Sequence, residues 1–304
     1  MGASDMKKFI INILIFFGIV AVLDVAAGKV FWYLQSSKAG GRTGAEYYAC
    51  KESNEDVIIM GSSRASHHYV PKIITESLGL SCFNAGQDGN GIILQYGRWK
   101  MISERYTPKV LIYDVTPVFD LCKNDNMTYI DRLKPFCDNS DVSGYVTSMF
   151  PLEKIKLYSL MYRYNYKFLE MASDCARGGS DEMKGYIPLY GAIRKEVVES
   201  SSSSDVTAIE EDNIKIYYLE LLAKECKERG TKLVFVASPA FNGAGYNLET
   251  FSSVSKISNQ YSIPFYYYNE SEFSCNPSLF KDSGHLNDAG AIAFTKDLVC
   301  HIQI

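Results

Sequence analysis

A serine placed directly after an apolar run is the first residue with the setting of a nucleophile. Residues 56–61 read DVIIMG, and Ser62, Ser63 and Arg64 follow at once. If the run is a strand of an open parallel sheet, Ser63 lies at its carboxyl end, where ligands bind and where helix N-termini favour negative charge. This setting suits a hydroxyl whose attack creates an oxyanion. The alternative is a serine that only caps the following helix.

A second stretch supplies a base and its partner. KDSGHLNDAG at 281–290 places Asp282 three residues before His285, ahead of the last predicted helix. A catalytic serine needs a base with a pKa near neutral, and that base needs an acceptor that fixes its tautomer. An Asp-x-x-His turn provides both groups from one loop, and the chain has only four histidines. The alternative is a polar helix cap beside a surface histidine.

A glycine-rich loop follows the second predicted strand. The sequence FNAGQDGNG at 83–91 has glycines at 86, 89 and 91. Such glycines let the backbone approach a ligand closely and present N–H groups to it. Alone the loop is a weak signal, but beside the serine and the histidine it can supply the oxyanion donors that acyl transfer requires.

The order of these motifs resembles that of the SGNH (GDSL-like) hydrolase superfamily over most of residues 56–301. The resemblance implies that Ser63 is the nucleophile, that His285 is the base and that Asp282 is the partner of the base. It also implies that Gly89 donates its N–H to the oxyanion. GSSR stands where many members have Gly-Asp-Ser, which looks like the membrane-anchored envelope branch related to O-acyltransferases and to the teichoic acid D-alanylation protein.

The same resemblance has one gap. Asn84 matches the asparagine before the glycine loop, in a structural role, but the Gly-x-Asn-Asp motif that carries a third oxyanion donor is missing. Its place reads YDVTPVFD at 113–120, where Thr116 or a donor from 118–205 is the candidate replacement. One such donor is worth about 10²- to 10³-fold in rate. The gap therefore favours acyl transfer to a particular acceptor over efficient general esterase activity.

The polar residues beside Ser63 allow further roles. Arg64 can hold an anionic substrate group or form an internal ion pair. The adjacent His67 and His68 point in different directions on a helix, so a metal site that uses both is not expected. His68 is an alternative base, although it stands only five residues from Ser63. Serine acyl chemistry requires neither a metal nor an organic cofactor.

The eight cysteines show no CxxC or Cys/His ligand spacing, so we predict no zinc site. Outside the cytoplasm, Cys122 and Cys137 could close a disulfide loop. Buried free thiols are the equal alternative.

The elements that must position these residues follow from an alternation of apolar runs and helical patterns. The sequence predicts a flavodoxin-like three-layer α/β/α fold with about five parallel strands, preceded by one N-terminal transmembrane helix. The predicted strands are 56–61, 81–86, 109–115, 231–238 and 264–269, and the predicted helices are 71–79, 91–105, 206–229, 248–260 and 288–300. Gly230 is the predicted C-cap of the helix at 206–229, and Asn287 or Asp288 can cap the last helix.

One long connection interrupts this rhythm. Residues 118–205 lie between two strands and include the polar run ESSSSSD. A connection of this length is usually functional, so we expect a cap over the carboxyl ends of the strands or a partly disordered segment. Within it, LYSLMYRYNYKF at 157–168 allows sugar stacking, with ordinary aromatic packing as the alternative.

The N-terminus is unlike that of a soluble protein. After Lys7 and Lys8, residues 9–27 are almost entirely apolar up to Asp24, and about 19 helical residues span ~28 Å, close to the thickness of a bilayer core. The positive-inside tendency makes residues 1–8 a cytoplasmic tail and puts the rest outside the cytoplasm. A cleaved signal peptide and a buried core helix are the alternatives. We expect a linker at 28–55 and the hydrolase-like domain at 56–304.

A formal net charge of -4 with scattered basic residues argues against nucleic-acid binding. The sequence thus predicts a bacterial, membrane-anchored domain in the periplasm or at the cell surface. We interpret it as a serine ester hydrolase or O-acyltransferase acting on small acyl esters, such as O-acetyl groups of envelope glycans, with a membrane-embedded acyl-donor protein as a possible partner. The alternative is a catalytically weak glycan-binding or assembly component.

Overall fold

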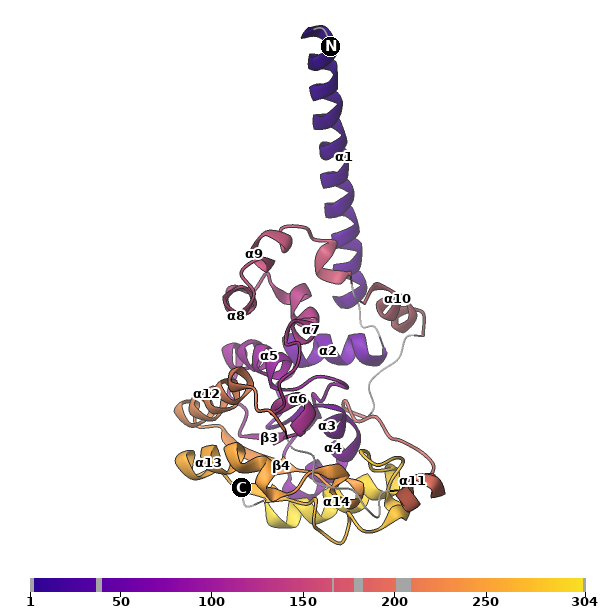
Figure 1. Ribbon diagram of the computed structural model, residues 1–304, viewed down its shortest axis with the longest axis vertical. Helices are drawn as coiled ribbons and strands as arrows, with labels where there is room; N and C mark the ends of the chain where they lie inside the picture. The colour runs from indigo at the N-terminus through magenta and orange to yellow at the C-terminus, as the bar shows by residue number, and fades with distance from the viewer. Residues whose placement is uncertain (1–2, 37–39, 166, 178–182, 201–208, 303–304) are drawn as a thin grey trace. The chain divides into compact units, whose positions relative to one another are not determined.

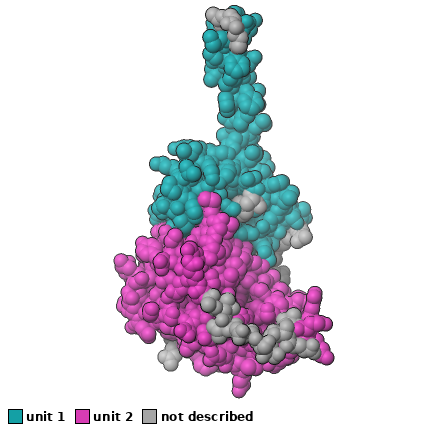
Figure 2. All heavy atoms as spheres, viewed as in Figure 1, with its two compact units in different colours: residues 1–47, 131–180 teal, residues 48–130, 181–304 magenta. Residues whose placement is uncertain are grey.

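The chain forms two compact units (Figure 2). The computed structural model describes residues 3–36, 40–165, 167–177, 183–200 and 209–302. Unit 1 consists of residues 1–47 and 131–180, and unit 2 consists of residues 48–130 and 181–304.

Unit 2 contains a five-stranded sheet in which every pair of neighbours is parallel. The strand order is β2-β1-β3-β4-β5, which is the flavodoxin-like order. This confirms the predicted fold class and each of the five predicted strands. Their bounds are β1 Val57–Gly61, β2 Cys82–Asn84, β3 Val110–Asp114, β4 Lys232–Ala237 and β5 Phe265–Tyr267.

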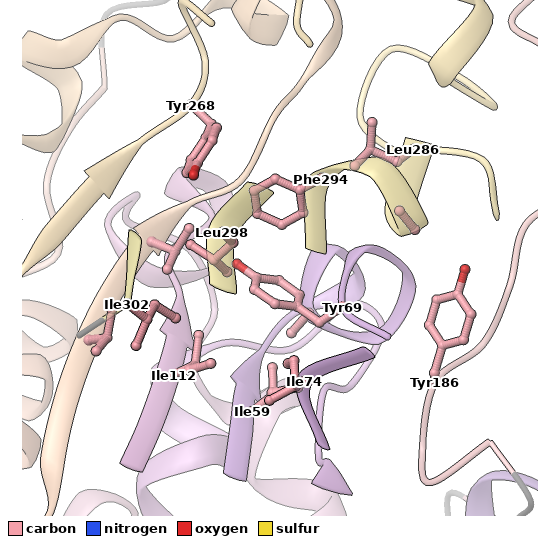
Figure 3. Packing of buried hydrophobic residues seen from close by; sticks show 14 of the residues in the cluster. Ile59, Tyr69, Ile74, Ile112, Tyr186, Tyr268, Leu286, Phe294, Leu298 and Ile302 are labelled. Carbon is pink, nitrogen blue, oxygen red and sulfur yellow. The ribbon is translucent and has the colours of Figure 1, made fainter. Parts of the chain in front are cut away.

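The three central strands are apolar on both faces because helices cover both sides of the sheet. On one side, Ile59 and Ile112 join a buried cluster with Tyr69, Phe294 and Leu298 (Figure 3). These side chains come from β1, β3, the connection between the two short helices after β1, and the last helix of the chain. The core therefore lies directly beneath the loops that follow β1 and β3.

The helices of unit 2 fall into two layers. Helices α3, α4 and α14 pack together on one side, while α5, α12 and α13 pack on the other. The bounds are α3 Ser63–His68, α4 Pro71–Leu78, α5 Ile92–Arg105, α6 Pro117–Asp120, α7 Met127–Ile130, α11 Lys195–Ser200, α12 Asn213–Arg229, α13 Ser252–Tyr261 and α14 Asp288–His301. Three short 3₁₀ helices are η4 Phe241–Gly245, η5 Leu248–Phe251 and η6 Pro277–Leu279.

The helix predicted at 206–229 begins later than expected. Residues 206–208 lie outside the described residues, and Asp212 caps the helix by accepting from the N–H of Ile214. Glu211 forms an antiparallel bridge with Cys122, which keeps the chain extended up to the cap. At the other end Gly230 adopts the left-handed conformation predicted for it.

Unit 1 is helical in its described part. It contains α1 Ala3–Ser36, η1 Asp131–Phe136, α8 Ser140–Met149, α9 Glu153–Lys156, η2 Tyr162–Tyr164 and α10 Phe168–Arg177 (Figure 1). Helix α2, Gly41–Lys51, crosses the boundary between the units. Much of residues 28–55, where we expected a linker, is thus helical: residues 28–36 continue α1, and α2 follows.

Helix α1 is long and apolar enough to cross a membrane, with a mean hydropathy of 2.6. Its C-terminal third packs within unit 1, because Gly28 lies against Leu160 and the ring of Phe31 contacts those of Tyr164 and Phe168. The remainder of the helix, up to Leu23, is exposed. The apolar helix is therefore continuous with packed protein structure rather than joined to it by a loop.

The long connection at 118–205 divides between the two units. Its residues 131–180 group with the N-terminal helix, while residues 183–193 belong to unit 2 and run beside α3. Most of the polar run ESSSSSD lies outside the described residues. In the tyrosine-rich stretch, Tyr162 bonds the carboxylate of Glu153 and Tyr164 is buried against Phe31. These two rings take part in packing, the alternative to sugar stacking.

Candidate active site

The turn after β1 places Ser63 over the carboxyl end of the sheet. Strand β1 ends at Gly61, whose φ of +141° lies in the region that only glycine adopts freely. A Cβ on Gly61 would also lie 2.6 Å from the carbonyl oxygen of Asp114 on the neighbouring strand β3. This close approach lets the chain turn sharply, so that Ser63 becomes the first residue of α3.

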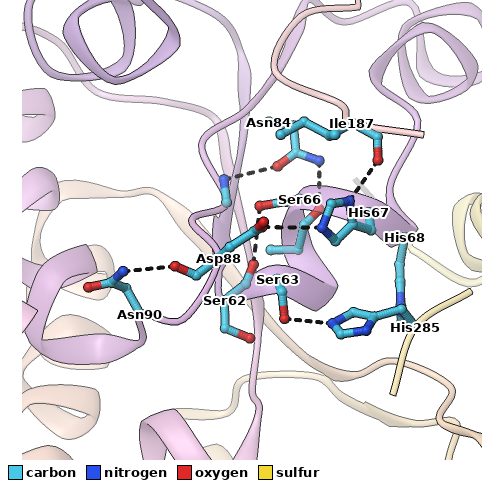
Figure 4. A network of polar contacts seen from close by, with 12 residues as sticks. Ser62, Ser63, Ser66, His67, His68, Asn84, Asp88, Asn90, Ile187 and His285 are labelled. Atoms are coloured by element: carbon cyan, nitrogen blue, oxygen red, sulfur yellow. Dashed lines mark hydrogen bonds and ion pairs between the residues drawn. The ribbon is translucent and has the colours of Figure 1, made fainter. Parts of the chain in front are cut away.

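Ser63 and His285 are 222 residues apart in the chain but in direct contact (Figure 4). The Oγ atom of Ser63 lies 2.8 Å from Nε2 of His285. The Nδ1 atom of His285 lies 2.9 and 3.1 Å from the two carboxylate oxygens of Asp282. Since an ionised carboxylate only accepts, the proton of the neutral ring is on Nδ1, and Nε2 is left to accept from the serine hydroxyl. This arrangement can remove a proton from Ser63.

The Asp282 carboxylate also builds the turn that carries the base. Its Oδ1 atom accepts from the backbone N–H groups of Gly284 and His285, both at 2.9 Å. Burial raises the pKa of Asp282, but the hydrogen bonds and charge of His285 and the two backbone N–H groups outweigh it, so that the pKa lies below its ordinary value. The pair is open to solvent: the side chains of His285 and Asp282 are 27% and 53% exposed.

His68 links the helix of the nucleophile to the loop of the base. Its Nε2 atom accepts from the N–H of Leu286 at 3.0 Å, and its Nδ1 atom lies 2.9 Å from Oγ of Ser238. Leu286 directly follows His285, so this bond fixes the backbone beside the base. Both ring nitrogens are engaged and the side chain is fully buried. His68 is therefore placed to position His285, and it does not reach Ser63 as the alternative base.

His68 makes stability depend on pH. Burial, with the nearby His285 and Arg64, holds the pKa of His68 well below its ordinary value of about 6.5. Below pH 6.5 the unfolded chain therefore binds a proton that the folded chain does not. We expect stability to fall with decreasing pH, with a contribution from this group of up to ~1.4 kcal/mol per pH unit.

Urea unfolding at pH 7, 6 and 5 measures this contribution. The variant His68→Asn should be less stable at pH 7 but should lose this part of the slope. The exposed His301→Asn should keep the slope of the wild type. Equal slopes in the wild type and His68→Asn would contradict the assignment.

The glycine loop after β2 is held by Asn84, as the sequence suggested. Its side-chain amide donates to the carbonyl oxygens of Ala65 and Tyr69, at 2.7 and 3.1 Å, and its Oδ1 atom accepts from the N–H of Gly86 at 3.0 Å. A Cβ on Gly86 would lie 2.4 Å from the backbone nitrogen of Ser66, so the loop passes directly against α3. Asn84 is structural in this geometry.

We expect Asn84→Ala to destabilise the fold by about 2–4 kcal/mol, because it removes three hydrogen bonds made by a buried side chain. Urea unfolding at pH 7 gives the value. Asn259→Ala, on the exposed side of α13, is the control and should change stability by less than about 0.5 kcal/mol. A loss below 1 kcal/mol in Asn84→Ala would show that the loop finds other partners.

Two side chains of α5 that the sequence analysis missed also hold this loop. Gln95 donates to the carbonyls of Gly61 and Ala85, at 2.7 and 3.3 Å. Arg98 donates to the carbonyl of Ala85 and to Oε1 of Gln87, both at 2.9 Å. Both side chains are buried. Polar residues in the middle of a helix that otherwise packs inward were the signal that could have identified them.

The backbone N–H groups of the two residues expected to bind an oxyanion have no acceptor in the described part of the chain. Among the described residues, neither the N–H of Ser63 nor that of Gly89 donates a hydrogen bond. Gly89 has a φ of +69°, and open space lies where a Cβ would stand. The first N–H groups of a helix have no partner within it, so α3 adds a favourable field for negative charge at Ser63.

Thr116, the candidate third donor, points elsewhere. Its Oγ1 atom accepts from the hydroxyl of Ser62 at 2.7 Å and lies 3.5 Å from Oδ1 of Asp114. Its backbone N–H donates to Asp120, whose carboxylate also accepts from the N–H of Ile92 at the start of α5. Thr116 is buried and joins the ends of β1 and β3 instead of facing the hydroxyl of Ser63.

Arg64 lies in the buried polar layer beneath the nucleophile. Its guanidinium donates to the carbonyl of Ser238 at 3.3 Å, and its charge opposes the rise in the pKa of Asp114 that burial causes. The same carboxylate accepts from the hydroxyl of Tyr69. Only 4% of the surface of Arg64 is exposed, and the carboxylate of Asp114 is close enough to feel its charge. These surroundings fit an internal ion pair better than an open site for an anionic substrate group.

His67 lies between the glycine loop and His285 (Figure 4). Its Nδ1 atom donates to the carbonyl of Ile187 at 2.7 Å, and its Nε2 atom lies 3.2 Å from Oδ1 of Asp88 in the glycine loop. The ring edge meets that of His285, with 5.6 Å between the centroids. An oxygen atom therefore lies next to each of the two ring nitrogens of His67.

None of the cysteines is paired in a disulfide in the structure. All eight cysteines are free thiols, Cys122 and Cys137 included. In the described part of the chain, no group of three or more His, Cys, Asp or Glu residues is arranged to hold a metal ion.

Fold and site together define the class: a parallel α/β protein with a Ser-His-Asp constellation at the carboxyl ends of its strands. No protein-family model matches the chain, and no curated protein matches it. Among solved structures, an acetyl xylan esterase is similar over 81% of this chain and 100% of its own, with a TM-score of 0.38 and 13% identity. Similarity at this level carries no conclusion about activity.

Proposed function

We propose that this protein is a serine-dependent ester hydrolase or O-acyltransferase. The observation that carries the proposal is the hydrogen-bond path from Ser63 through His285 to Asp282, with distances of 2.8 and 2.9 Å. A serine that only capped α3 would not require a histidine on its hydroxyl or a carboxylate on the far nitrogen of that histidine. A nucleophile, a general base and a group that orients the base are the three roles of a Ser-His-Asp triad.

The proposed reaction assigns one role to each of these groups. Ser63 Oγ attacks the acyl carbonyl while Nε2 of His285 takes its proton, and the oxyanion forms next to the free N–H groups of Ser63 and Gly89. When the intermediate collapses, His285 returns the proton to the leaving alcohol and the acyl group stays on Ser63. Water, or the hydroxyl of a sugar acceptor, then attacks the acyl-serine in the same way and releases the enzyme.

The substrate class rests on the resemblance to the membrane-anchored branch of the SGNH hydrolases. GSSR at 61–64 stands where many members of the superfamily have Gly-Asp-Ser, and this replacement looks like that branch. We therefore propose small acyl esters, such as O-acetyl groups of envelope glycans. A membrane-embedded protein that hands over the acyl group is the expected partner of a transferase.

An uncleaved membrane anchor is part of the proposal. The carboxylate of Asp24 in α1 accepts from the hydroxyl of Ser159 and from the N–H groups of Leu160 and Met161. Cleavage near residues 26–28 would remove Asp24 and leave these donors without their acceptor. Lys7 and Lys8 before the apolar stretch support an orientation in which the rest of the chain lies outside the cytoplasm.

A second candidate function is a glycan-binding or assembly component with little turnover. The position of Thr116 favours this second function. Its hydroxyl bonds Ser62 and its N–H bonds Asp120, so Thr116 does not add a third oxyanion donor to the two backbone N–H groups. Loss of one donor costs about 10²- to 10³-fold in rate. The two candidates differ in whether Ser63 reacts.

Labelling with a fluorophosphonate probe distinguishes them. Full-length wild type in detergent should become labelled on Ser63, as located by peptide mass, and Ser63→Ala should not be labelled. Ser66→Ala, in the same helix, is the control and should label like the wild type. An unlabelled wild-type protein that is shown to be folded would favour the binding function.

A further inference from the structure

A row of exposed apolar side chains lies on unit 1. Leu152, Ile155, Tyr158 and Met161, here called the 152–161 face, are 71%, 72%, 81% and 50% exposed. They follow one another through α9 and the segment after it. Single exposed apolar residues are ordinary, but four of them within ten residues indicate a surface that something covers.

This face is continuous with the apolar helix α1. The last part of the face is bound to α1 by Asp24, which accepts from Ser159 at 2.5 Å, from Leu160 at 2.8 Å and from Met161 at 3.1 Å. Gly28, one helical turn further on, lets Leu160 pack directly against the α1 backbone, since a Cβ there would lie 2.3 Å from that of Leu160. The level of the face along α1 is thus fixed between Asp24 and Gly28.

The length of α1 sets this level relative to a bilayer. The apolar stretch 9–23 between Lys8 and Asp24 spans only ~22 Å as a helix, whereas the hydrocarbon core is about 30 Å thick. About 20 residues are needed, which extends the span to Gly28 and ends it before Lys29. Asp24 then lies ~7 Å inside that boundary, and so does the segment that it binds.

We propose that the 152–161 face inserts into the outer interfacial layer of the bilayer beside α1. This inference rests on the proposed membrane anchor. Leu152 and Ile155 suit the acyl boundary, and Tyr158 suits the headgroup level, where tyrosines are enriched. Lys154 on the same short helix can extend toward anionic headgroups.

The polar groups at this depth are compatible with the proposal. The carboxylate of Asp24 has three donors, which is how acidic side chains at membrane depth are accommodated. Behind the face, Glu153 is buried and paired with Lys134 and Lys156, and it bonds the hydroxyl of Tyr162. Helix α9 therefore presents its apolar side chains outward while its buried charge is paired within unit 1.

Depth-dependent quenching tests the proposal on the full-length protein. The variants Ile155→Trp and Tyr158→Trp are reconstituted into nanodiscs of phosphatidylcholine and phosphatidylglycerol whose acyl chains carry bromine near the headgroup or near the bilayer centre. The emission of Trp32 and Trp99 is subtracted with wild-type protein. We expect the added tryptophan to be quenched at least twofold, and more by the shallow bromines than by the deep ones.

Tyr217→Trp is the matched control, because Tyr217 is 56% exposed on α12 of unit 2. It should not be quenched. If neither Ile155→Trp nor Tyr158→Trp is quenched in discs that contain only lipid, the proposal is wrong, even if another protein covers the face in the cell. Equal quenching of the control would also overturn it, because contact with lipid would not then single out this face.

The quenching result can be separated from the proposed membrane anchor and from the proposed serine chemistry. Flotation of the same proteoliposomes, and resistance to alkaline extraction, report whether α1 is an anchor. Protein that floats while Ile155→Trp and Tyr158→Trp stay unquenched would overturn the interfacial face alone. Fluorophosphonate labelling in the same discs reports the serine chemistry independently of both.

Discussion

Replacing Ser63 with alanine is expected to lower kcat for a small acetyl ester by about 10⁴-fold or more, and replacing His285 with alanine should have an effect of similar size. The reason is that the two groups act as one unit. Without Oγ no acyl-enzyme forms, and without Nε2 at 2.8 Å the hydroxyl keeps its proton. Steady-state hydrolysis of 4-nitrophenyl acetate, corrected for the uncatalysed rate, measures both losses.

The double variant gives the sharper test. If Ser63 and His285 serve one step, Ser63→Ala/His285→Ala should be no slower than either single variant. Losses that multiply would mean that the residual activity uses His285 in another way. Ser66→Ala, whose hydroxyl lies on the same helix 3.4 Å from the carbonyl of Ser62, should remain within a few-fold of the wild type.

Replacing Asp282 with asparagine should lower kcat by about 10²- to 10⁴-fold while leaving the fold intact. An asparagine oxygen can still accept from the N–H groups of Gly284 and His285, so the turn should persist. What is lost is the negative charge that fixes the Nδ1–H tautomer and stabilises the imidazolium. Because Asp282 is half exposed, we expect a smaller loss than for a buried aspartate.

The chain offers a matched control for this charge. Asp297 and His301 form a second Asp-His pair in α14, with 3.5 Å between their nearest side-chain atoms. Asp297→Asn also removes an acidic partner of a histidine, but it should leave kcat within a few-fold. A loss in Asp282→Asn no larger than that in Asp297→Asn would remove Asp282 from the proposed mechanism.

The strands of unit 2 could be predicted because burial on both faces leaves a plain pattern. The runs that became β1, β3 and β4 are short, apolar and rich in β-branched residues, and glycine or polar residues end them. The motif order also predicted that Ser63, His285 and Asp282 would meet, and the structure places them in hydrogen-bond contact. The catalytic roles of these residues stay predictions.

Other features depend on contacts between distant residues, which no local pattern contains. The bond between His68 and the N–H of Leu286 joins positions 218 residues apart. Gly28 packs against Leu160, and residues 28–36, the start of the expected linker, continue helix α1. In both cases the residue type permits several roles, and only the folded partner selects one.

The openness of the Asp282–His285 turn has a consequence for the size of the substrate. A base buried in a deep pocket can serve only molecules that enter the pocket whole. Here the imidazole and the carboxylate lie at the protein surface, at the rim of the sheet. An acyl group could therefore reach Ser63 while it is still attached to a long polymer, one repeat at a time, with the remainder of the strand outside the protein.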